Sequence, residues 1–272
     1  MVIMVHPSAS AGPASAQLTL FSMPAETLRT GHGVSWLAYV GVEEQVKAAE
    51  FKNPDEALAF AAQHTLMRCM AATLLGVKAT AAAEIAVDRT CLLCGSGQPH
   101  GKPRIEGVNL SMARSLGLAA GVTGPAGLSI GLDLITVRGS YYDSFDSIAL
   151  ADYEKRVVAS LPTAEAALAR HLLWSAKEAV LKATGYGLAL APSTVMLALP
   201  PLPAALEDAH GLTARASVQL PGEAQPRTYW VTWQVHEGTY LLAIASDQPH
   251  TLTSHRVTAP LMVRRALEQE MH

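Results

Sequence analysis

The chain of 272 residues contains little cysteine and no long uninterrupted apolar segment. Its three cysteines cannot all pair with one another, and for this length they are too few for a disulfide framework. No apolar run approaches the roughly 18 residues of a membrane span. The apolar run Met1–Val5 is too short for a signal core and has no basic segment before it. We therefore expect a soluble protein of a reducing, cytoplasmic compartment.

An excess of either charge is also absent. Twenty Lys and Arg residues against 23 Asp and Glu residues give a formal net charge of −3, which provides no general field for attracting nucleic acid or an anionic membrane. Neither is expected as a partner, and any phosphate must be bound by a local cluster of side chains. Hydrophobic residues make up 50% of the chain, enough for a large core in one domain or in two of ordinary size.

The first part of the chain reads as a lead-in followed by a helical region. Residues 1–24 include a stretch rich in Ala, Ser and Pro without periodicity, so we expect a loose lead-in there. The segment 25–128 is expected to form one α+β half, with a short strand at Trp36–Val40. Helical spacing follows at 42–76, where Pro54 suits the first turn of a second helix.

The segment 129–247 is expected to form a second half of similar plan. Leu128–Ile135 alternates between apolar residues and mostly small or polar ones, as a strand does, which puts Asp133 on the face opposite the alternating leucines and isoleucine. A long helix is expected at about 162–183. The tail, 248–272, is expected to be a weak helix at best.

A β-hairpin is expected at 229–245, with Glu237 and Gly238 in its turn. The order helix, strands, helix, strands thus occurs roughly twice along the chain. This order predicts an α+β fold built from a pseudo-two-fold pair of similar halves.

The last turns of the predicted long helix carry a carboxylate and an ammonium on one stripe. Trp174, Glu178 and Lys182 are spaced four residues apart, so they share one face of a helix. Asp133 and Glu178 form the best candidate pair of Mg²⁺ ligands, since Mg²⁺ usually takes one or two protein carboxylates together with water and phosphate oxygens. The alternative is that Glu178 and Lys182 form an ordinary exposed ion pair and Asp133 caps a strand.

Three motifs, in order along the chain, carry a resemblance to a known family. They are His100-Gly101-Lys102-Pro103, Gly131-Leu132-Asp133 and Trp174-Ser175-Ala176-Lys177-Glu178-Ala179-Val180-Leu181-Lys182. With these motifs the chain resembles the Sfp-type 4′-phosphopantetheinyl transferases, from the helical region at 43–76 to about Gly187. The loop Arg89-Thr90-Cys91-Leu92-Leu93-Cys94-Gly95 resembles the actinobacterial branch of that family.

The resemblance implies two α+β halves with coenzyme A and Mg²⁺ in the cleft between them. It also implies an activity: the 4′-phosphopantetheine arm of coenzyme A moves to a serine hydroxyl of an apo acyl or peptidyl carrier protein, and 3′,5′-ADP is released. Carrier proteins of this kind serve polyketide, nonribosomal peptide or fatty-acid synthesis. Two halves in one chain would already build the cleft, so a monomer is expected.

By the same resemblance, Asp133 and Glu178 would bind the metal, and Glu178 would accept the proton of the attacking serine. Lys182 would neutralise the departing phosphate, with Lys177 assisting. The residues expected to bind the coenzyme are Arg68, Lys102, Pro103, His100, Arg114, Lys177 and Lys47.

Two positions depart from the family pattern. Ile135 stands two residues beyond Asp133, where the family usually has a glutamate on the same strand face, so we expect weaker metal binding. Met112 stands in the place of a histidine that contacts the 3′-phosphate, and it cannot donate that hydrogen bond. Arg114 or His100 is expected to reach this phosphate instead.

Two other functions are compatible with the sequence. A relative that binds coenzyme A or carrier protein could have lost catalysis through Ile135 and Met112. Alternatively, Cys91, Cys94 and His100 form a C-x2-C-x5-H group, and zinc held there with a fourth ligand would make the protein a metal-stabilised scaffold for a synthase. The presence of both carboxylates and the second lysine of the transferase motifs favours the enzyme.

Overall fold

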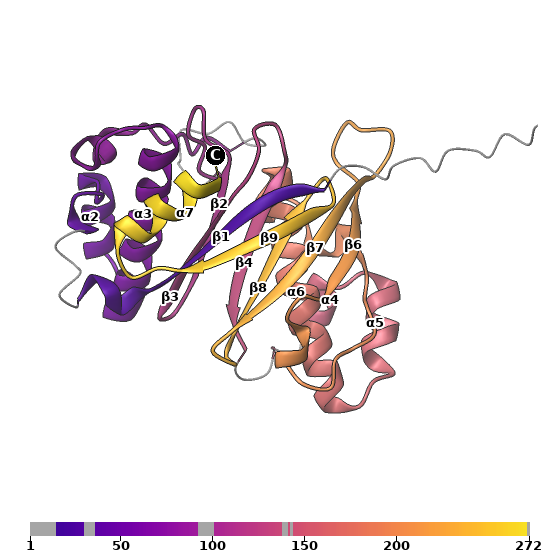
Figure 1. Ribbon diagram of the computed structural model, residues 1–272. Coiled ribbons are helices and arrows are strands. Elements are labelled where there is room, and N and C mark those ends of the chain that lie inside the picture. The colour runs from indigo at the N-terminus through magenta and orange to yellow at the C-terminus, as the bar shows by residue number, and fades with distance from the viewer. Residues whose placement is uncertain (1–14, 30–35, 92–100, 138–140, 142–143, 271–272) are drawn as a thin grey trace, which may run out of the picture.

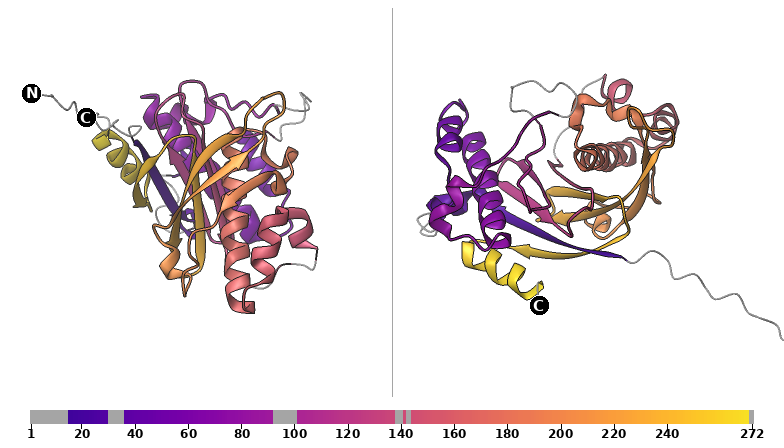
Figure 2. Two further views of the ribbon diagram at one scale, coloured as in Figure 1. Left: turned by 90° about the vertical axis from the view of Figure 1, so that its right-hand side faces the viewer. Right: turned by 90° about the horizontal axis from the view of Figure 1, so that it is seen from above.

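The computed structural model describes residues 15–29, 36–91, 101–137, 141 and 144–270. Its architecture is mixed α+β: two β-sheets pack against each other, and helices cover the outer face of each sheet (Figure 1). Seen from above, the purple helices of the first half and the pink helices of the second lie on opposite sides of the sheets (Figure 2). Within the described ranges, none of the helices combines the length and the apolar character that a membrane span requires.

The first half is built on a four-stranded sheet of order β2-β3-β1-β9. Its strands are β1 (Ala16–Pro24), β2 (Leu110–Ser115), β3 (Leu118–Thr123) and β9 (His250–Arg256). β1 pairs antiparallel with β3 and parallel with β9, the last strand of the chain. The helical elements of this half are α2 (Val42–Ala49), α3 (Pro54–Leu74), α7 (Pro260–Glu270), η1 (Ala25–Leu28) and η2 (Ala79–Glu84).

α3 begins and ends at the residues that the sequence predicts. The Asn53 side chain accepts a hydrogen bond from the Asp55 amide (2.9 Å), and Pro54 occupies the first turn. The chain leaves the helix through Gly76, whose φ of +64° lies in the left-handed region. The buried side chains of α3 share a cluster with those of β1 and α7, which includes Phe21, Leu66, Met70, Val263 and Leu267.

The second half is built on a five-stranded antiparallel sheet of order β4-β8-β7-β6-β5. Its strands are β4 (Ile130–Thr136), β5 (Val195–Ala198), β6 (Thr213–Val218), β7 (Arg227–His236) and β8 (Tyr240–Ser246). Its helical elements are α4 (Phe145–Ala149), α5 (Asp152–Ala159), α6 (Thr163–Thr184), η3 (Gly187–Ala189), η4 (Pro192–Thr194) and η5 (Glu207–Ala209). α6 packs across β4 and β8 and is the longest helix in the described part of the chain.

The two sheets meet through a shared apolar layer. Leucines of β1 and β4 alternate into it, together with Val122 of β3 and Leu242 and Ile244 of β8. The α6 helix covers the opposite face of β4. β4 is therefore buried on both faces, and it places its residues between the two halves of the protein.

The structure confirms the predicted long helices, the strand at β4 and the hairpin. α6 ends at Gly185, whose φ is +83°. In the turn between the paired residues His236 and Tyr240, Glu237 has a φ of 55° and Gly238 a φ of 58°, the left-handed conformation that tight hairpin turns favour.

Three expectations are wrong. Residues 1–24 are not loose throughout, because Ala16–Pro24 forms β1; this strand is buried on both faces, so its apolar run lacks the alternation of a one-sided strand. The tail is not a weak helix only: His250–Arg256 forms the largely exposed edge strand β9, and α7 follows it. Trp36–Val40 is not a strand, since Trp36 and Leu37 are helical. Local sequence gave no sign of the pairing that makes β9 a strand.

Candidate active site between the two halves

β4 and α6 approach each other at a glycine. A Cβ atom on Gly131 would lie 2.5 Å from the backbone nitrogen of Ala183 and 3.0 Å from the carbonyl carbon of Ala179. The α6 backbone therefore packs directly on this strand. Asp133, two residues along β4, projects from the same strand face and points toward α6.

Asp133 and Lys182 form an ion pair across this contact. Nζ of Lys182 donates a hydrogen bond to Oδ1 of Asp133 at 2.6 Å. Glu178, one helical turn before Lys182, interacts electrostatically with both residues and is only 8% exposed. The alternative prediction of an exposed Glu178–Lys182 ion pair is therefore wrong. Glu178 is buried, and Lys182 pairs with Asp133.

Both carboxylates of this group have an oxygen without a partner. Oδ2 of Asp133 and Oε1 of Glu178 are buried and accept no hydrogen bond within the described part of the chain. Burial and, to a smaller extent, the negative charge of Asp133 raise the pKa of Glu178 to about 7, while Lys182 opposes both effects. A buried carboxylate oxygen without a partner lowers the stability of the folded protein. A cation bound between the two carboxylates would supply the missing partner.

The donor set fits Mg²⁺. Hard oxygen ligands from one or two carboxylates, completed by water and phosphate oxygens, are typical of Mg²⁺ bound with a phosphorylated substrate. Among the described residues, no group of three or more His, Cys, Asp or Glu side chains is placed to hold a metal. Any metal here would therefore need ligands from a substrate or from solvent in addition to Asp133 and Glu178.

A cavity of about 380 Å³ opens beside Glu178 and Lys182, and both halves of the protein line it. From the first half come Cys91, Gly101, Lys102, Pro103, Ser111 and Met112, and from the second come Glu178, Lys182, Gly185, Tyr186, Gly187, Leu188 and Ala189. The predicted residues Lys102 and Pro103 are thus brought to the predicted carboxylate. The volume falls in the range of small-molecule sites.

Lys102 and Lys182 place two ammonium groups at this cavity. Nζ of Lys102 donates to the Ile130 carbonyl oxygen at 2.6 Å. Burial and, to a smaller extent, the charge of Lys182 lower the pKa of Lys102 to about 8. An anionic ligand would therefore be stabilised by both groups.

The two residues that depart from the family pattern, Met112 and Ile135, lie on β2 and β4. Met112 is buried and lines the cavity, where its side chain can donate no hydrogen bond. Ile135 is partly buried and packs on the core under α6. Within the described residues, β4 therefore presents one carboxylate, Asp133, toward the helix.

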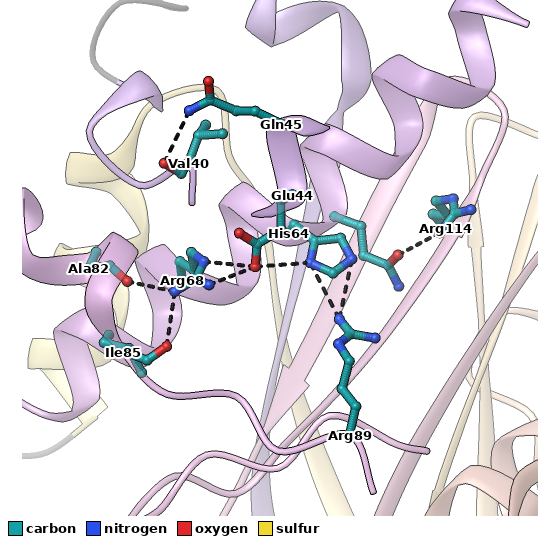
Figure 3. Close-up of polar contacts among 10 residues, drawn as sticks. Val40, Glu44, Gln45, His64, Arg68, Ala82, Ile85, Arg89 and Arg114 are labelled. Carbon is teal, nitrogen blue, oxygen red and sulfur yellow. Dashed lines mark hydrogen bonds and ion pairs between the residues drawn. The ribbon is translucent and has the colours of Figure 1, made fainter. Parts of the chain in front are cut away.

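A second polar cluster lies in the first half of the protein (Figure 3). Arg68 donates to Oε1 of Glu44 from Nη2 (2.6 Å) and Nε (3.0 Å), and from Nη1 to the carbonyl oxygens of Ala82 (2.9 Å) and Ile85 (3.1 Å). Burial alone would raise the pKa of Glu44, but hydrogen bonds from His64 and Arg68 lower it to about 2. Contrary to the expectation for Arg68, its guanidinium is already engaged in holding α3 to α2 and η2.

Arg89 belongs to this cluster, although the sequence analysis did not select it as a site residue. Its Nη2 lies 3.3 Å from Nε2 of His64, and no carboxylate within the described ranges forms an ion pair with it. Arg89, Arg68 and Glu44 line a separate cavity of about 740 Å³. The sequence feature that could have identified Arg89 is its position as a basic residue at the start of the Cys-x2-Cys loop.

Arg114 lies on the other side of His64 from Arg68 (Figure 3). It donates to Oε1 of Gln63 (3.0 Å) and stacks over the rings of Phe60 and Phe51, at 5.2 and 5.6 Å from their centroids. Burial lowers the pKa of both Arg89 and Arg114. The cluster thus contains two half-buried guanidinium groups whose charge a bound anion could neutralise.

Two predicted residues lie away from these cavities. Lys177 is fully buried and forms an ion pair with Glu154 at 2.7 Å, so the structure does not bring it to Glu178 and Lys182. Lys47 is exposed and pairs with Glu50 at 2.6 Å. His100 and Cys94 lie outside the described residues; of the proposed zinc group, the structure describes Cys91 alone, which is buried and lines the cavity beside Glu178.

Residues 129–245 match the model of the 4′-phosphopantetheinyl transferase superfamily. This segment runs from the start of β4 into β8 and contains Asp133, Glu178 and Lys182. The mixed α+β architecture with two sheets is consistent with the fold of that superfamily. No curated protein matches the sequence significantly. Residues 129–245, which carry the candidate site, are thus similar to a domain of this transferase superfamily.

Proposed function

We propose that the protein transfers the 4′-phosphopantetheine arm of coenzyme A to a serine hydroxyl of an apo acyl or peptidyl carrier protein and releases 3′,5′-ADP. The observation that carries this proposal is the pair of partnerless oxygens on Asp133 and Glu178, beside Lys182 and within the matched segment. A cavity lined by both halves lies next to them. The nine-residue motif that ends at Lys182 supports assignment to the Sfp type.

Asp133 and Glu178 would hold Mg²⁺ through the two free oxygens. When bound, Mg²⁺ supplies positive charge to the diphosphate of coenzyme A. The two lysines at the cavity also supply positive charge. The ammonium groups of Lys182 and Lys102 can donate hydrogen bonds to phosphate oxygens.

The residues of the chain account for the transfer step. The serine oxygen attacks the β-phosphorus of coenzyme A, the bond from this phosphorus to the bridging oxygen breaks, and 3′,5′-ADP leaves with the electron pair. Glu178, the carboxylate that lines the cavity, accepts the serine proton. Lys182 donates to the leaving phosphate, so no covalent enzyme intermediate is needed.

Arg89 and Arg114 are the side chains best suited to the 3′-phosphate. Arg68 is engaged with Glu44, and Met112 cannot donate a hydrogen bond. The two half-buried guanidinium groups form no close ion pair with a carboxylate within the described residues, although Glu44 and Glu56 interact with them electrostatically. Arginine also matches phosphate geometry well. The proposed enzyme is a cytoplasmic monomer. It binds the 3′-phosphate of coenzyme A at Arg89 and Arg114 and the carrier serine at Glu178.

Mass spectrometry of apo carrier proteins tests the proposed function. Wild-type protein, coenzyme A and Mg²⁺ are incubated with several apo acyl and peptidyl carriers, and each carrier is expected to gain the mass of one phosphopantetheine arm. The Glu178→Gln variant is the control for background transfer. If no carrier gains this mass although the protein binds coenzyme A, the protein is the catalytically impaired relative that Ile135 and Met112 would favour.

A further inference from the structure

Lys177 and Glu154 form the most deeply buried ion pair in the described part of the chain. The exposed fractions of their side chains are 0% and 1%, and Nζ lies 2.7 Å from Oε2. Neither residue lines the cavity beside Glu178. Contact with a substrate in this cavity therefore does not explain the ion pair.

Hydrogen bonds connect this pair to three elements. Oε2 of Glu154 accepts from the Ala151 amide (2.8 Å) at the start of α5, and Oε1 accepts from the Leu197 amide (3.0 Å) in β5. Nζ of Lys177 donates to the carbonyl oxygens of Pro192 (3.1 Å) and Val195. The three donors of the ammonium are therefore all used, which fixes its direction.

The position of Lys177 sets the rotation of α6. Consecutive helical residues point roughly 100° apart around the axis, so the direction in which Lys177 is held also determines where Glu178 points. Gly131 fixes the distance between α6 and β4 on the sheet side of the helix, and apolar side chains of α6 pack in the core of this half. The hydrogen bonds of Lys177 add a directional restraint to this packing. Replacing a buried ion pair by apolar residues is often neutral or stabilising, so stability alone does not explain this pair.

We propose that Lys177 and Glu154 are positioning residues that hold α6 in the rotation at which Glu178 and Lys182 face Asp133. This inference rests on the proposed transferase function. It assigns the first lysine of the nine-residue motif to the scaffold under the site and the second lysine, Lys182, to the site itself.

Three variants and one control test this assignment. Lys177→Met leaves the Glu154 charge buried and unpaired. Glu154→Gln with Lys177→Met removes both charges, and the amide oxygen introduced at residue 154 still accepts from Leu197. Glu154→Gln alone leaves Lys177 without a counter-ion. The control is Lys155→Met, which removes the neighbouring exposed pair with Asp152.

For each variant we would measure the urea midpoint, kcat and KM for transfer, and Mn²⁺ affinity by electron paramagnetic resonance, with Mn²⁺ in place of Mg²⁺. The single variants are expected to lower the urea midpoint strongly, and the double variant to recover most of this loss. At a temperature where all proteins are folded, the double variant is expected to keep KM for coenzyme A within about threefold, while kcat and Mn²⁺ affinity fall at least about tenfold. Lys155→Met is expected to match wild type.

A double variant with wild-type kcat and Mn²⁺ affinity would overturn the inference and leave the pair a purely structural one. If the wild-type protein modifies no carrier, the proposed function fails, and the positioning role is then decided by Mn²⁺ affinity alone. Wild-type protein that also binds no Mn²⁺ would overturn both.

Discussion

Gly131 of β4 lies against the backbone of α6 at Ala179: a Cβ atom on the glycine would be 3.0 Å from the Ala179 carbonyl carbon and closer still to its oxygen. This contact brings the helix near enough to β4 for Lys182 to reach Asp133. The glycine is therefore part of the geometry of the site, although it has no side chain to contribute.

Gly131→Ala is expected to push α6 away from β4. The inserted methyl group meets backbone atoms that cannot rotate aside, so we expect a loss of stability of about 1–3 kcal/mol together with a large loss of transfer. Urea unfolding and the carrier assay measure the two effects. Gly222→Ala is the control: Gly222 has a φ of +80° with nothing within 4 Å, so it should lose some stability and keep full turnover. A Gly131→Ala protein with normal turnover would contradict this role.

The two carboxylates should be indispensable and not interchangeable with amides. Asp133→Asn and Glu178→Gln each remove the charge of a carboxylate that has an oxygen without a partner among the described residues. Each is expected to lower kcat about 100-fold or more without unfolding the protein. Glu165→Gln, at an exposed position near the start of the same helix, is the control. Metal-dependent turnover near the wild-type level in either variant would refute the assignment of the metal ligands.

The raised pKa of Glu178 predicts opposite pH dependences for stability and activity. The folded-state pKa of about 7 lies above the value of 4.5 for an unperturbed glutamate, so the folded state binds the proton more tightly than the unfolded state. Without metal, the free energy of unfolding should therefore fall as pH rises from about 4.5 to 7, by up to about 3 kcal/mol. Transfer requires the deprotonated form, and bound Mg²⁺ favours that form, so activity with Mg²⁺ should rise with pH at a pH below 7.

Urea unfolding at pH 5.5 and pH 8 in the absence of metal measures the stability effect. Glu178→Gln should remove this part of the pH dependence and be more stable than wild type at pH 8. An equal pH dependence in Glu178→Gln and wild type would show that another group is responsible.

Arg89 is expected to distinguish coenzyme A from its 3′-dephospho form. Arg89→Gln removes a half-buried guanidinium that has no carboxylate partner among the described residues, so KM for coenzyme A should rise roughly 10-fold to 100-fold. KM for 3′-dephospho-coenzyme A should change little. Arg104→Gln is the control, since Arg104 is engaged with Asp88 at 2.6 Å. An equal rise in KM for both substrates would place the 3′-phosphate elsewhere.

Local sequence predicted those elements of the fold whose signals are local. α3 and α6 have regular apolar spacing and glycine ends, and the β7–β8 hairpin has a turn that favours positive φ. β1 and β9 were missed for opposite reasons. β1 is apolar on both faces, and β9 is polar on most of its surface; each is a strand because of its partners, which are far away in the sequence.

The candidate site was predictable where one motif supplies several side chains. Glu178 and Lys182 share a helix stripe, and the strand alternation indicated the direction of Asp133. The spacing could not show that Lys177 turns into the core, because its partner Glu154 lies on another helix. It also could not show that Glu44 engages Arg68, or that Arg89 reaches His64, since these contacts depend on how α2, α3 and the loop after η2 pack together.

Ile135→Glu should strengthen metal binding, because it adds a carboxylate to the strand face that carries Asp133. Ile135 is two residues beyond Asp133, pairs with Leu241 of β8, and is only partly buried. The change should lower the Mg²⁺ concentration for half-maximal transfer several-fold, since each added carboxylate raises the affinity of such sites. It should also lower the free energy of unfolding by about 1 kcal/mol through lost apolar burial.

Ile135→Gln is the control, because glutamine has nearly the same shape as glutamate without the charge, and it separates the two effects. If both variants shift the Mg²⁺ requirement equally, the side chain at 135 does not reach the metal, and Asp133 and Glu178 are the complete set of protein ligands among the described residues.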